Sequence, residues 1–242
     1  MKALLKVKDL SIEIGSKRLV DSIGFSLDEN QTLAIVGESG SGKSLTALSL
    51  LGLLPEGSKV HAEKIHFDSL SLLGLEKKTW QQLRGEAIGM VFQEPQSSLN
   101  PSMRCGPQVL EVLQQHRSSE EATQEIVLTA FEQVLLPEPK RIFKAYPHEL
   151  SGGQKQRVMI AMALICQPKL LICDEPTTAL DVTVQKEVLA LLKQLQQQYK
   201  MSILFISHDL SLVRSFADSV LVMQGGKIVE QGSAKSLFSK PQ

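Results

Sequence analysis

The chain of 242 residues lacks an excess of charge of either sign, a long apolar run and a leader-like start. The chain has 26 lysine and arginine residues and 26 aspartate and glutamate residues, so its net charge does not indicate electrostatic binding of nucleic acid or anionic lipid. No apolar run approaches the length of a membrane span. Charge interrupts the first residues too early for a signal peptide. We therefore expect any role at a membrane to come through a partner.

Cysteine is scarce as well, and its placement excludes some classes of site. The three cysteines, Cys105, Cys166 and Cys173, show no paired spacing, so neither a disulfide framework nor a metal cluster is expected. Two of them lie in apolar runs and are typical of reduced core residues in a cytosolic protein. Hydrophobic residues make up 43% of the chain, which is enough for a full core. The length indicates one large α/β domain, or one domain with a lobe.

What the sequence does contain is a glycine-rich stretch, Gly37-Glu-Ser-Gly-Ser-Gly-Lys43-Ser44, that fits the P-loop spacing at every fixed position. The apolar run 32–36 before it has strand character, and residues 45–51 after it can continue as a helix. Glycines let backbone N–H groups approach a polyphosphate, and the helix adds its positive end. Lys43 is expected to reach the β- and γ-phosphates and Ser44 to hold Mg²⁺. The alternative for the motif alone is a glycine-rich turn that matches by chance.

The pattern around this stretch predicts an α/β core. Residues 4–14 and 18–27 indicate an antiparallel hairpin beside the core. The core itself is expected to span 1–93 and about 151–242, with helices over roughly 43–53, 154–166 and 182–198, an edge strand over 64–67, buried strands over 88–92, 170–173 and 202–207, and a closing hairpin over 219–229.

Between about residues 94 and 150 the pattern becomes helical and punctuated by proline, which predicts a helical lobe inserted into the core. Ser118 and Glu121 fit a capping box at the start of a helix. Its expected apolar face comprises Ile126, Val127, Ala130, Phe131 and Val134, and Pro137 and Pro139 are expected to end it. The whole chain is interpreted as one domain, a P-loop NTPase core with an antiparallel β subdomain and an inserted helical lobe.

Several polar groups follow predicted strands, and the carboxyl ends of strands are where α/β sheets bind ligands. Asp174 follows four apolar residues, as a Walker B aspartate does, and Glu175 beside it could polarise an attacking water. Gln93 could reach Mg²⁺ and this water, and His208 could bond the γ-phosphate. Taken alone, Gln93 could equally be an ordinary loop amide and His208 a satisfied histidine at a strand end.

The stretch Leu150-Ser-Gly-Gly-Gln154 decides between these interpretations, because here the sequence resembles the ATP-binding cassette (ABC) ATPase family, whose signature it matches letter for letter. The resemblance implies a head-to-tail dimer in which Ser151 and Gly153 of one subunit cap the γ-phosphate held by Lys43 of the other. Gln93 then matches the Q-loop, Asp174 and Glu175 match Walker B and the catalytic glutamate, 179–181 the D-loop, and His208 the switch histidine.

The resemblance assigns a role to each candidate. It implies that Lys43, Gln93, Glu175 and His208 are catalytic and that Ser44, Gln93 and Asp174 hold Mg²⁺. The residues implied to bind ATP are Ile14, Gly37, Glu38, Ser39, Gly40, Ser41, Gly42, Lys43, Ser44, Leu45, Ser151, Gly152, Gly153, Gln154 and Asp181. The family usually has an aromatic residue near Ile14 that stacks on adenine, so nucleobase selectivity is expected to be relaxed.

Residues 92–101, 146–150, 157–164 and 174–185 further resemble the dipeptide, oligopeptide and nickel importer branch of the family. That branch implies two integral-membrane permeases, a second ABC ATPase subunit that is the same or homologous, and an extracytoplasmic solute-binding protein. It also implies a peripheral location on the cytoplasmic face of the inner or plasma membrane. An ABC exporter subunit, a soluble ABC ATPase of DNA repair or translation, and a regulatory module without turnover are the alternatives. Since many relatives continue past the position of Gln242, a short form, a truncated chain and half of a fused protein stay open.

Overall fold

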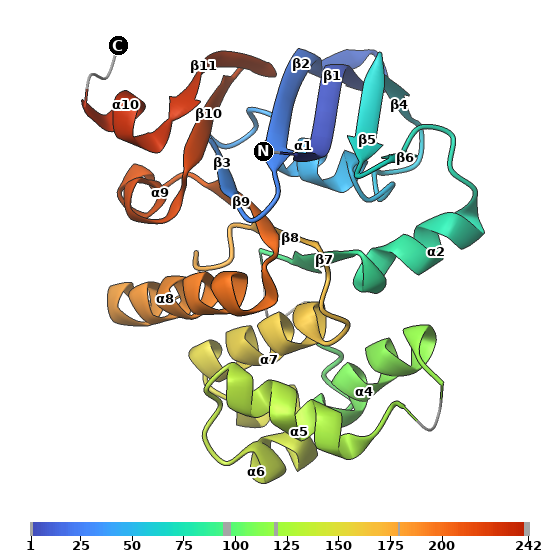
Figure 1. Ribbon diagram of the computed structural model, residues 1–242, viewed down its shortest axis with the longest axis vertical. Helices are drawn as coiled ribbons and strands as arrows, with labels where there is room; N and C mark the ends of the chain where they lie inside the picture. Colours follow the sequence, from blue (N-terminus) through green and yellow to red (C-terminus); the bar gives the residue numbers. More distant parts are fainter. Residues whose placement is uncertain (1, 94–97, 119–120, 179, 240–242) are drawn as a thin grey trace. The chain divides into compact units, whose positions relative to one another are not determined.

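The computed structural model describes residues 2–93, 98–118, 121–178 and 180–239. The chain divides into two compact units, the first formed by Met1–Gln81 with Gln196–Gln242 and the second by Gln82–Leu195 (Figure 1). Parallel and antiparallel strands both occur, together with helices, so the predicted α/β class is confirmed. No helix within the described ranges is long and apolar enough to cross a membrane.

The first unit begins with an antiparallel sheet. Its strands are β1 (Ala3–Ile14), β2 (Lys17–Asp28), β4 (Ser58–His61), β5 (Lys64–Phe67) and β6 (Leu70–Ser71), in the order β2-β1-β5-β6 with β4 also paired to β1. In β1 and β2, Val7 pairs with Phe25 and Ile14 with Lys17. The predicted hairpin is therefore confirmed, with nearly the predicted ends.

The second layer of strands in this unit is mainly parallel. It consists of β3 (Thr32–Val36), β9 (Ser202–Ser207), β10 (Ser219–Gln224) and β11 (Lys227–Ser233), in which β3 is parallel to both β9 and β10 while β10 and β11 form the predicted closing hairpin. Every residue of β3 and β9 is buried, as expected for parallel strands covered on both faces. The helices of the unit are α1 (Lys43–Ser49), α9 (Leu210–Phe216) and α10 (Ala234–Ser239).

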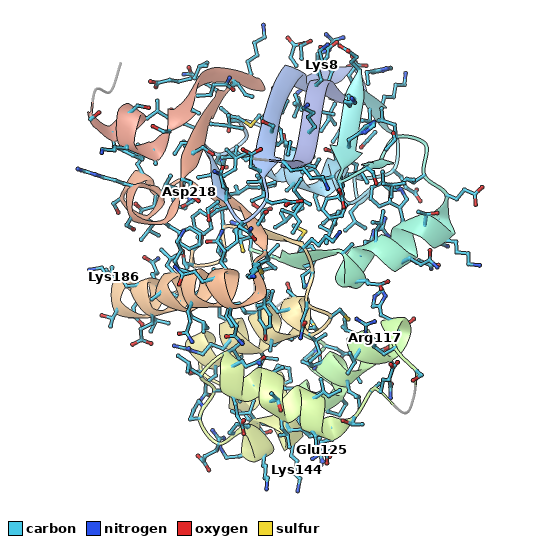
Figure 2. All side chains as sticks on the ribbon, viewed as in Figure 1. Lys8, Arg117, Glu125, Lys144, Lys186 and Asp218 are labelled. Carbon is cyan, nitrogen blue, oxygen red and sulfur yellow. The ribbon has the colours of Figure 1, made fainter. Side chains whose placement is uncertain are left out.

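The second unit combines two parallel strands with a group of helices. Strands β7 (Ile88–Val91) and β8 (Leu170–Asp174) pair so that Val91 lies opposite Cys173. The helices are α4 (Cys105–His116), α5 (Gln124–Gln133), α6 (Pro139–Lys144), the short 3₁₀ turn η1 (Pro147–Glu149) and α7 (Gly152–Leu164), and α4 to α7 pack on one another. Charged side chains such as Glu125 and Lys144 point outward from this group (Figure 2). Helices α2 (Lys77–Glu86) and α8 (Val182–Tyr199) span the sequence boundaries between the units.

The predicted start of the helix after residue 117 is wrong. The N–H and the hydroxyl of Ser118 both donate to Glu121 Oε2, at 3.1 and 3.0 Å, so this pair closes a local turn. Helix α5 begins only at Gln124, behind Thr123. On its predicted apolar face Val127 and Phe131 are fully buried, whereas Ile126 is 39% exposed and is therefore not a core residue.

Three other predicted boundaries differ from the structure. Strand β5 is not at an edge, because the two-residue strand β6 pairs with it. Helix α1 stops at Ser49 because the next N–H groups, from Leu50 to Gly52, bond three residues back and tighten the chain into a turn. Pro139 does not end α5 but lies in the first turn of α6, where its missing N–H is not needed.

Candidate functional site

The P-loop follows β3 and depends on glycine for steric reasons. Gly37 has φ +152°, and a Cβ built on it would lie 2.1 Å from the carbonyl oxygen of Met223 on β10. Gly42, the residue before α1, has φ +101°, and a Cβ there would lie 2.9 Å from the carbonyl oxygen of Leu19 on β2. The loop is therefore pressed against two strands at positions that only glycine can occupy.

Lys43 opens α1 and turns back over the loop. Its side chain is buried, and Nζ donates to the carbonyl oxygens of Gly37 at 2.8 Å and Glu38 at 2.7 Å. Ser41 Oγ is also buried and has no hydrogen-bond partner among the described residues. A buried ammonium and an unsatisfied hydroxyl in one glycine-rich loop are donors that suit phosphate oxygens. The loop thus fits the predicted polyphosphate ligand.

The other predicted residues of this loop vary in exposure. Glu38, Ser39 and Gly40 are exposed, whereas Ser44 and Leu45 in the first turn of α1 are half-buried. The N-cap residue of α1 has no side chain that could bond the helix N–H groups.

His208 lies at the same end of the sheet as the P-loop. Strands β3 and β9 run parallel with Val36 opposite Ser207, so Gly37 and His208 leave neighbouring strands side by side. His208 is exposed and precedes Asp209, which caps α9 by accepting the N–H groups of Ser211 and Leu212. The bonds from Ser211 hold the pKa of Asp209 below its usual value. The structure therefore brings His208 and the P-loop together.

Ile14 ends β1, where it is half-buried and pairs with Lys17 and Ser58. The P-loop touches β2 at Val20, which pairs with Ile12. Ile14 is thus two residues beyond the strand pair that the loop contacts.

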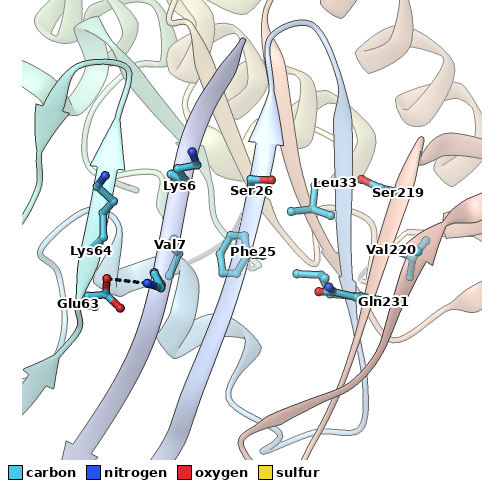
Figure 3. A pocket seen from close by; sticks show the side chains of 13 residues that line it. Lys6, Val7, Phe25, Ser26, Leu33, Glu63, Lys64, Ser219, Val220 and Gln231 are labelled. Atoms are coloured by element: carbon cyan, nitrogen blue, oxygen red, sulfur yellow. Dashed lines mark hydrogen bonds and ion pairs between the residues drawn. The ribbon is translucent and has the colours of Figure 1, made fainter. Parts of the chain in front are cut away.

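Phe25, the nearest aromatic residue downstream of Ile14, faces a separate cavity. It lines a cavity of about 630 Å³ together with Leu33, Val220, Lys6 and Lys64 (Figure 3). No residue predicted to bind the nucleotide lines this cavity.

In the second unit too, the predicted polar groups lie at the carboxyl ends of paired parallel strands. Asp174 ends β8 and is 6% exposed, whereas Glu175 after it is half-buried with φ +46°. Gln93 follows β7, and its Nε2 donates to Glu175 Oε2 at 3.3 Å. The structure therefore joins the two predicted catalytic groups of this unit.

Sequence reasoning missed one further partner of Glu175. The hydroxyl of Thr178 donates to Glu175 Oε2 at 2.9 Å and lies 3.3 Å from the carbonyl oxygen of Glu175. The available signal was the spacing, because threonine hydroxyls commonly bond groups three residues earlier in the chain.

The predicted signature residues form the start of α7. Ser151 is the N-cap: its Oγ accepts the N–H of Gln154 at 3.3 Å, and its own N–H donates to Gln154 Oε1 at 3.1 Å. Both bonds of a capping box are therefore present. Gly152 and Gly153 follow, and a Cβ on Gly153 would lie 3.1 Å from the Val184 side chain.

Asp181 performs a similar capping task in α8, because its Oδ1 accepts the N–H groups of Thr183 and Val184 at 3.1 and 3.0 Å. The rest of the predicted D-loop includes residue 179, and the branch-specific segment 92–101 includes residues 94–97. These positions lie outside the described residues.

Comparison with known proteins identifies the family. A family model described as ABC transporter matches residues 20–178. The dipeptide transport ATP-binding protein DppD of Haemophilus influenzae is 46% identical over 99% of this chain and 74% of its own length. The oligopeptide transport ATP-binding protein OppD of Escherichia coli is 47% identical over 99% of this chain and 72% of its own.

A solved structure agrees with this result. The ATP-binding cassette MJ0796, a dimer bound to ADP and Pi, superposes with a TM-score of 0.82 and 26% identity, covering 95% of this chain and 98% of its own. The chain therefore belongs to the ABC transporter family. It is an ATPase with the predicted ABC ATPase fold.

Proposed function

We propose that this chain, acting as a single ABC ATPase domain, hydrolyses ATP to power the uptake of a peptide, nickel or a related small solute. The observation that carries this proposal is the identity of nearly half of its residues, over 99% of the chain, to ATP-binding proteins of dipeptide and oligopeptide transport. The geometry of the P-loop and of Glu175 supplies the groups that ATP hydrolysis needs.

The first unit binds the phosphates. Lys43 exchanges its bonds to the carbonyl oxygens of Gly37 and Glu38 for bonds to phosphate oxygens, and Ser41 gains a partner for its buried hydroxyl. Because the ammonium is already buried in the loop, little reorganisation is needed when charge develops on the γ-phosphate. His208, at the neighbouring strand end, donates to the same phosphate.

The second unit supplies the base. Glu175 accepts a proton from the attacking water, and Gln93 holds the carboxylate by its present bond. Ser44, Gln93 and Asp174 offer the hydroxyl, amide and carboxylate oxygens that suit Mg²⁺. When bound, Mg²⁺ withdraws negative charge from the phosphates as a Lewis acid.

Assembly completes the site. Ser151 to Gln154 of one subunit cap the γ-phosphate on the P-loop of a second ABC ATPase subunit, and Asp181 belongs to the same contact. The dimeric state of MJ0796 with ADP and Pi supports this arrangement. The dimer drives two integral-membrane permeases at the cytoplasmic face of the inner or plasma membrane, and an extracytoplasmic protein delivers the solute to them.

The proposal is tested by the substitution Glu175→Gln, with Glu125→Gln on the exposed face of α5 as the control. We expect E175Q to bind ATP, to lose nearly all phosphate release and to accumulate as a nucleotide-held dimer, because the amide cannot accept the proton of water. E125Q should match the wild type. Normal turnover by E175Q would refute the role of Glu175.

The predicted dimer and the membrane partners need separate measurements. Ser151→Arg should block ATP-driven dimerisation, measured by light scattering with E175Q as the parent, while ATP binding to the single subunit persists. Unchanged dimerisation would contradict the capping role. A pull-down of the tagged protein from gently solubilised membranes should recover two multispan permeases. Recovery of soluble proteins alone, from a preparation that retains its membrane complexes, would contradict the transport role.

A further inference from the structure

Two side chains from different parts of the second unit bind the same oxygen of Glu175. Gln93 Nε2 approaches Oε2 at 3.3 Å, and Thr178 Oγ1 approaches it at 2.9 Å. The second contact is the shorter one, and it comes from the same turn as the carboxylate itself.

The chemistry of these groups fixes the direction of both bonds. An ionised carboxylate has only acceptors, so Thr178 must donate its single hydroxyl hydrogen and Gln93 must present its NH₂ group. The hydroxyl hydrogen of Thr178 has two candidate acceptors, Glu175 Oε2 at 2.9 Å and the backbone oxygen of Glu175 at 3.3 Å. The shorter distance assigns the hydrogen to the carboxylate.

The backbone places Thr178 where this bond can form. Glu175 has φ +46°, a left-handed conformation that is unfavourable for a residue with a side chain. The chain then turns, and the N–H of Thr178 lies 3.4 Å from the carbonyl oxygen of Glu175. The turn thus carries the hydroxyl of Thr178 over the side chain of the residue that begins it.

We propose that Thr178 is a positioning residue for Glu175 in ATP hydrolysis. The inference rests on the proposed function, in which Glu175 accepts the proton of the attacking water. With Oε2 held by Thr178 and by Gln93, rotation of the carboxylate about its last torsion is restricted, and so is the direction in which the carboxylate presents its lone pairs. A base held in this way loses less freedom on reaching the transition state.

A purely structural role for Thr178 makes a different prediction. If the hydroxyl served only the turn, its main acceptor would be the backbone oxygen of Glu175, and removing it would lower stability. If the hydroxyl positions the carboxylate, its removal lowers kcat and leaves ATP binding intact. Thr178 is exposed, so the substitution creates no cavity.

The test compares Thr178→Val with Thr178→Ser in steady-state ATP hydrolysis. Loss of one charge-assisted bond to the base should lower kcat about tenfold. KM for ATP should change less than about twofold, because no phosphate contact is removed. T178S keeps the hydroxyl and should restore kcat to within about twofold of the wild type. The control is Thr183→Val, an exposed threonine in the first turn of α8, which should leave both constants unchanged.

A double-mutant cycle with Glu175→Gln separates this inference from the proposed function. If Thr178 acts through Glu175, adding T178V to E175Q should produce no further loss of single-turnover hydrolysis. A tenfold further loss in that background, wild-type kcat for T178V, or failure of T178S to recover activity would overturn the inference, while the large loss of turnover in E175Q itself would still support the proposed function. Wild-type turnover by E175Q itself would overturn the proposed function, and the inference with it.

Discussion

A methyl group on Gly37 should destabilise the fold independently of any effect on ATP. In Gly37→Ala the new Cβ would lie 2.1 Å from the carbonyl oxygen of Met223. This distance is 0.9 Å shorter than 3.0 Å, below which Cβ contacts are essentially never found. The obstacle is the backbone of β10, which cannot rotate away as a side chain can. Overpacking of this kind together with an unfavourable φ should lower the free energy of unfolding by about 3–5 kcal/mol.

The matched control is Gly15→Ala in the β1–β2 turn. Gly15 also has positive φ, +61°, but nothing lies within 4 Å of the place that its Cβ would take. It therefore isolates the backbone strain, which should amount to about 1–2 kcal/mol. Urea unfolding followed by far-ultraviolet circular dichroism, without nucleotide, measures both variants. Equal unfolding midpoints for G37A and G15A would refute the steric argument and leave φ as the only reason for glycine at position 37.

Three further predictions follow from local contacts. Asp209→Ala should lower the free energy of unfolding by about 1 kcal/mol at neutral pH, because α9 loses its cap. The folded state lowers the pKa of Asp209, so this contribution is present above the ordinary pKa of 3.8 and is lost as the pH falls below that value. Urea unfolding at several pH values across that range measures the loss. Gln156→Met should be neutral or stabilising by about 1 kcal/mol in the same assay, because both amide atoms of this fully buried side chain have no hydrogen-bond partner among the described residues. A marked loss of stability would mean that the amide does have a partner. With Ile14 in place of an aromatic residue, ATP and GTP should compete on similar terms in a fluorescence titration, and a strong preference for ATP would mean that another group holds the adenine.

The P-loop could be predicted from the sequence because its backbone conformation requires glycine at fixed positions. Gly37 and Gly42 adopt conformations and contacts that only glycine tolerates, so their spacing carries the geometry directly. The positions of Gln93 and His208 were accessible for a related reason. Each follows a short apolar run that forms a buried parallel strand, and such strands deliver the next residue to a common edge.

The same local pattern succeeded at one serine and failed at another. Ser151 with Gln154 and Ser118 with Glu121 both fit the capping box, but only the first begins a helix. At Ser118 the hydroxyl donates to the Glu121 carboxylate, and the N–H of Glu121 donates to the backbone oxygen of Ser118 instead of its hydroxyl, so the cap bond is missing. The pattern shows only that two side chains can form hydrogen bonds with the backbone. Whether a helix begins there depends on the residues that follow.

Asp174 and Glu175 show most clearly what a linear pattern leaves out. In a continuing strand two adjacent side chains point to opposite faces, so a shared site for both does not follow from the spacing alone. The strand instead ends at Asp174, and the positive φ of Glu175 redirects the chain at that residue. This break, which no propensity of glutamate favours, is what brings the carboxylate to Gln93 and Thr178. Backbone strain of this kind persists where surrounding contacts hold a residue in place, and it clusters at functional sites, so the conformation of Glu175 supports its role as a reacting group.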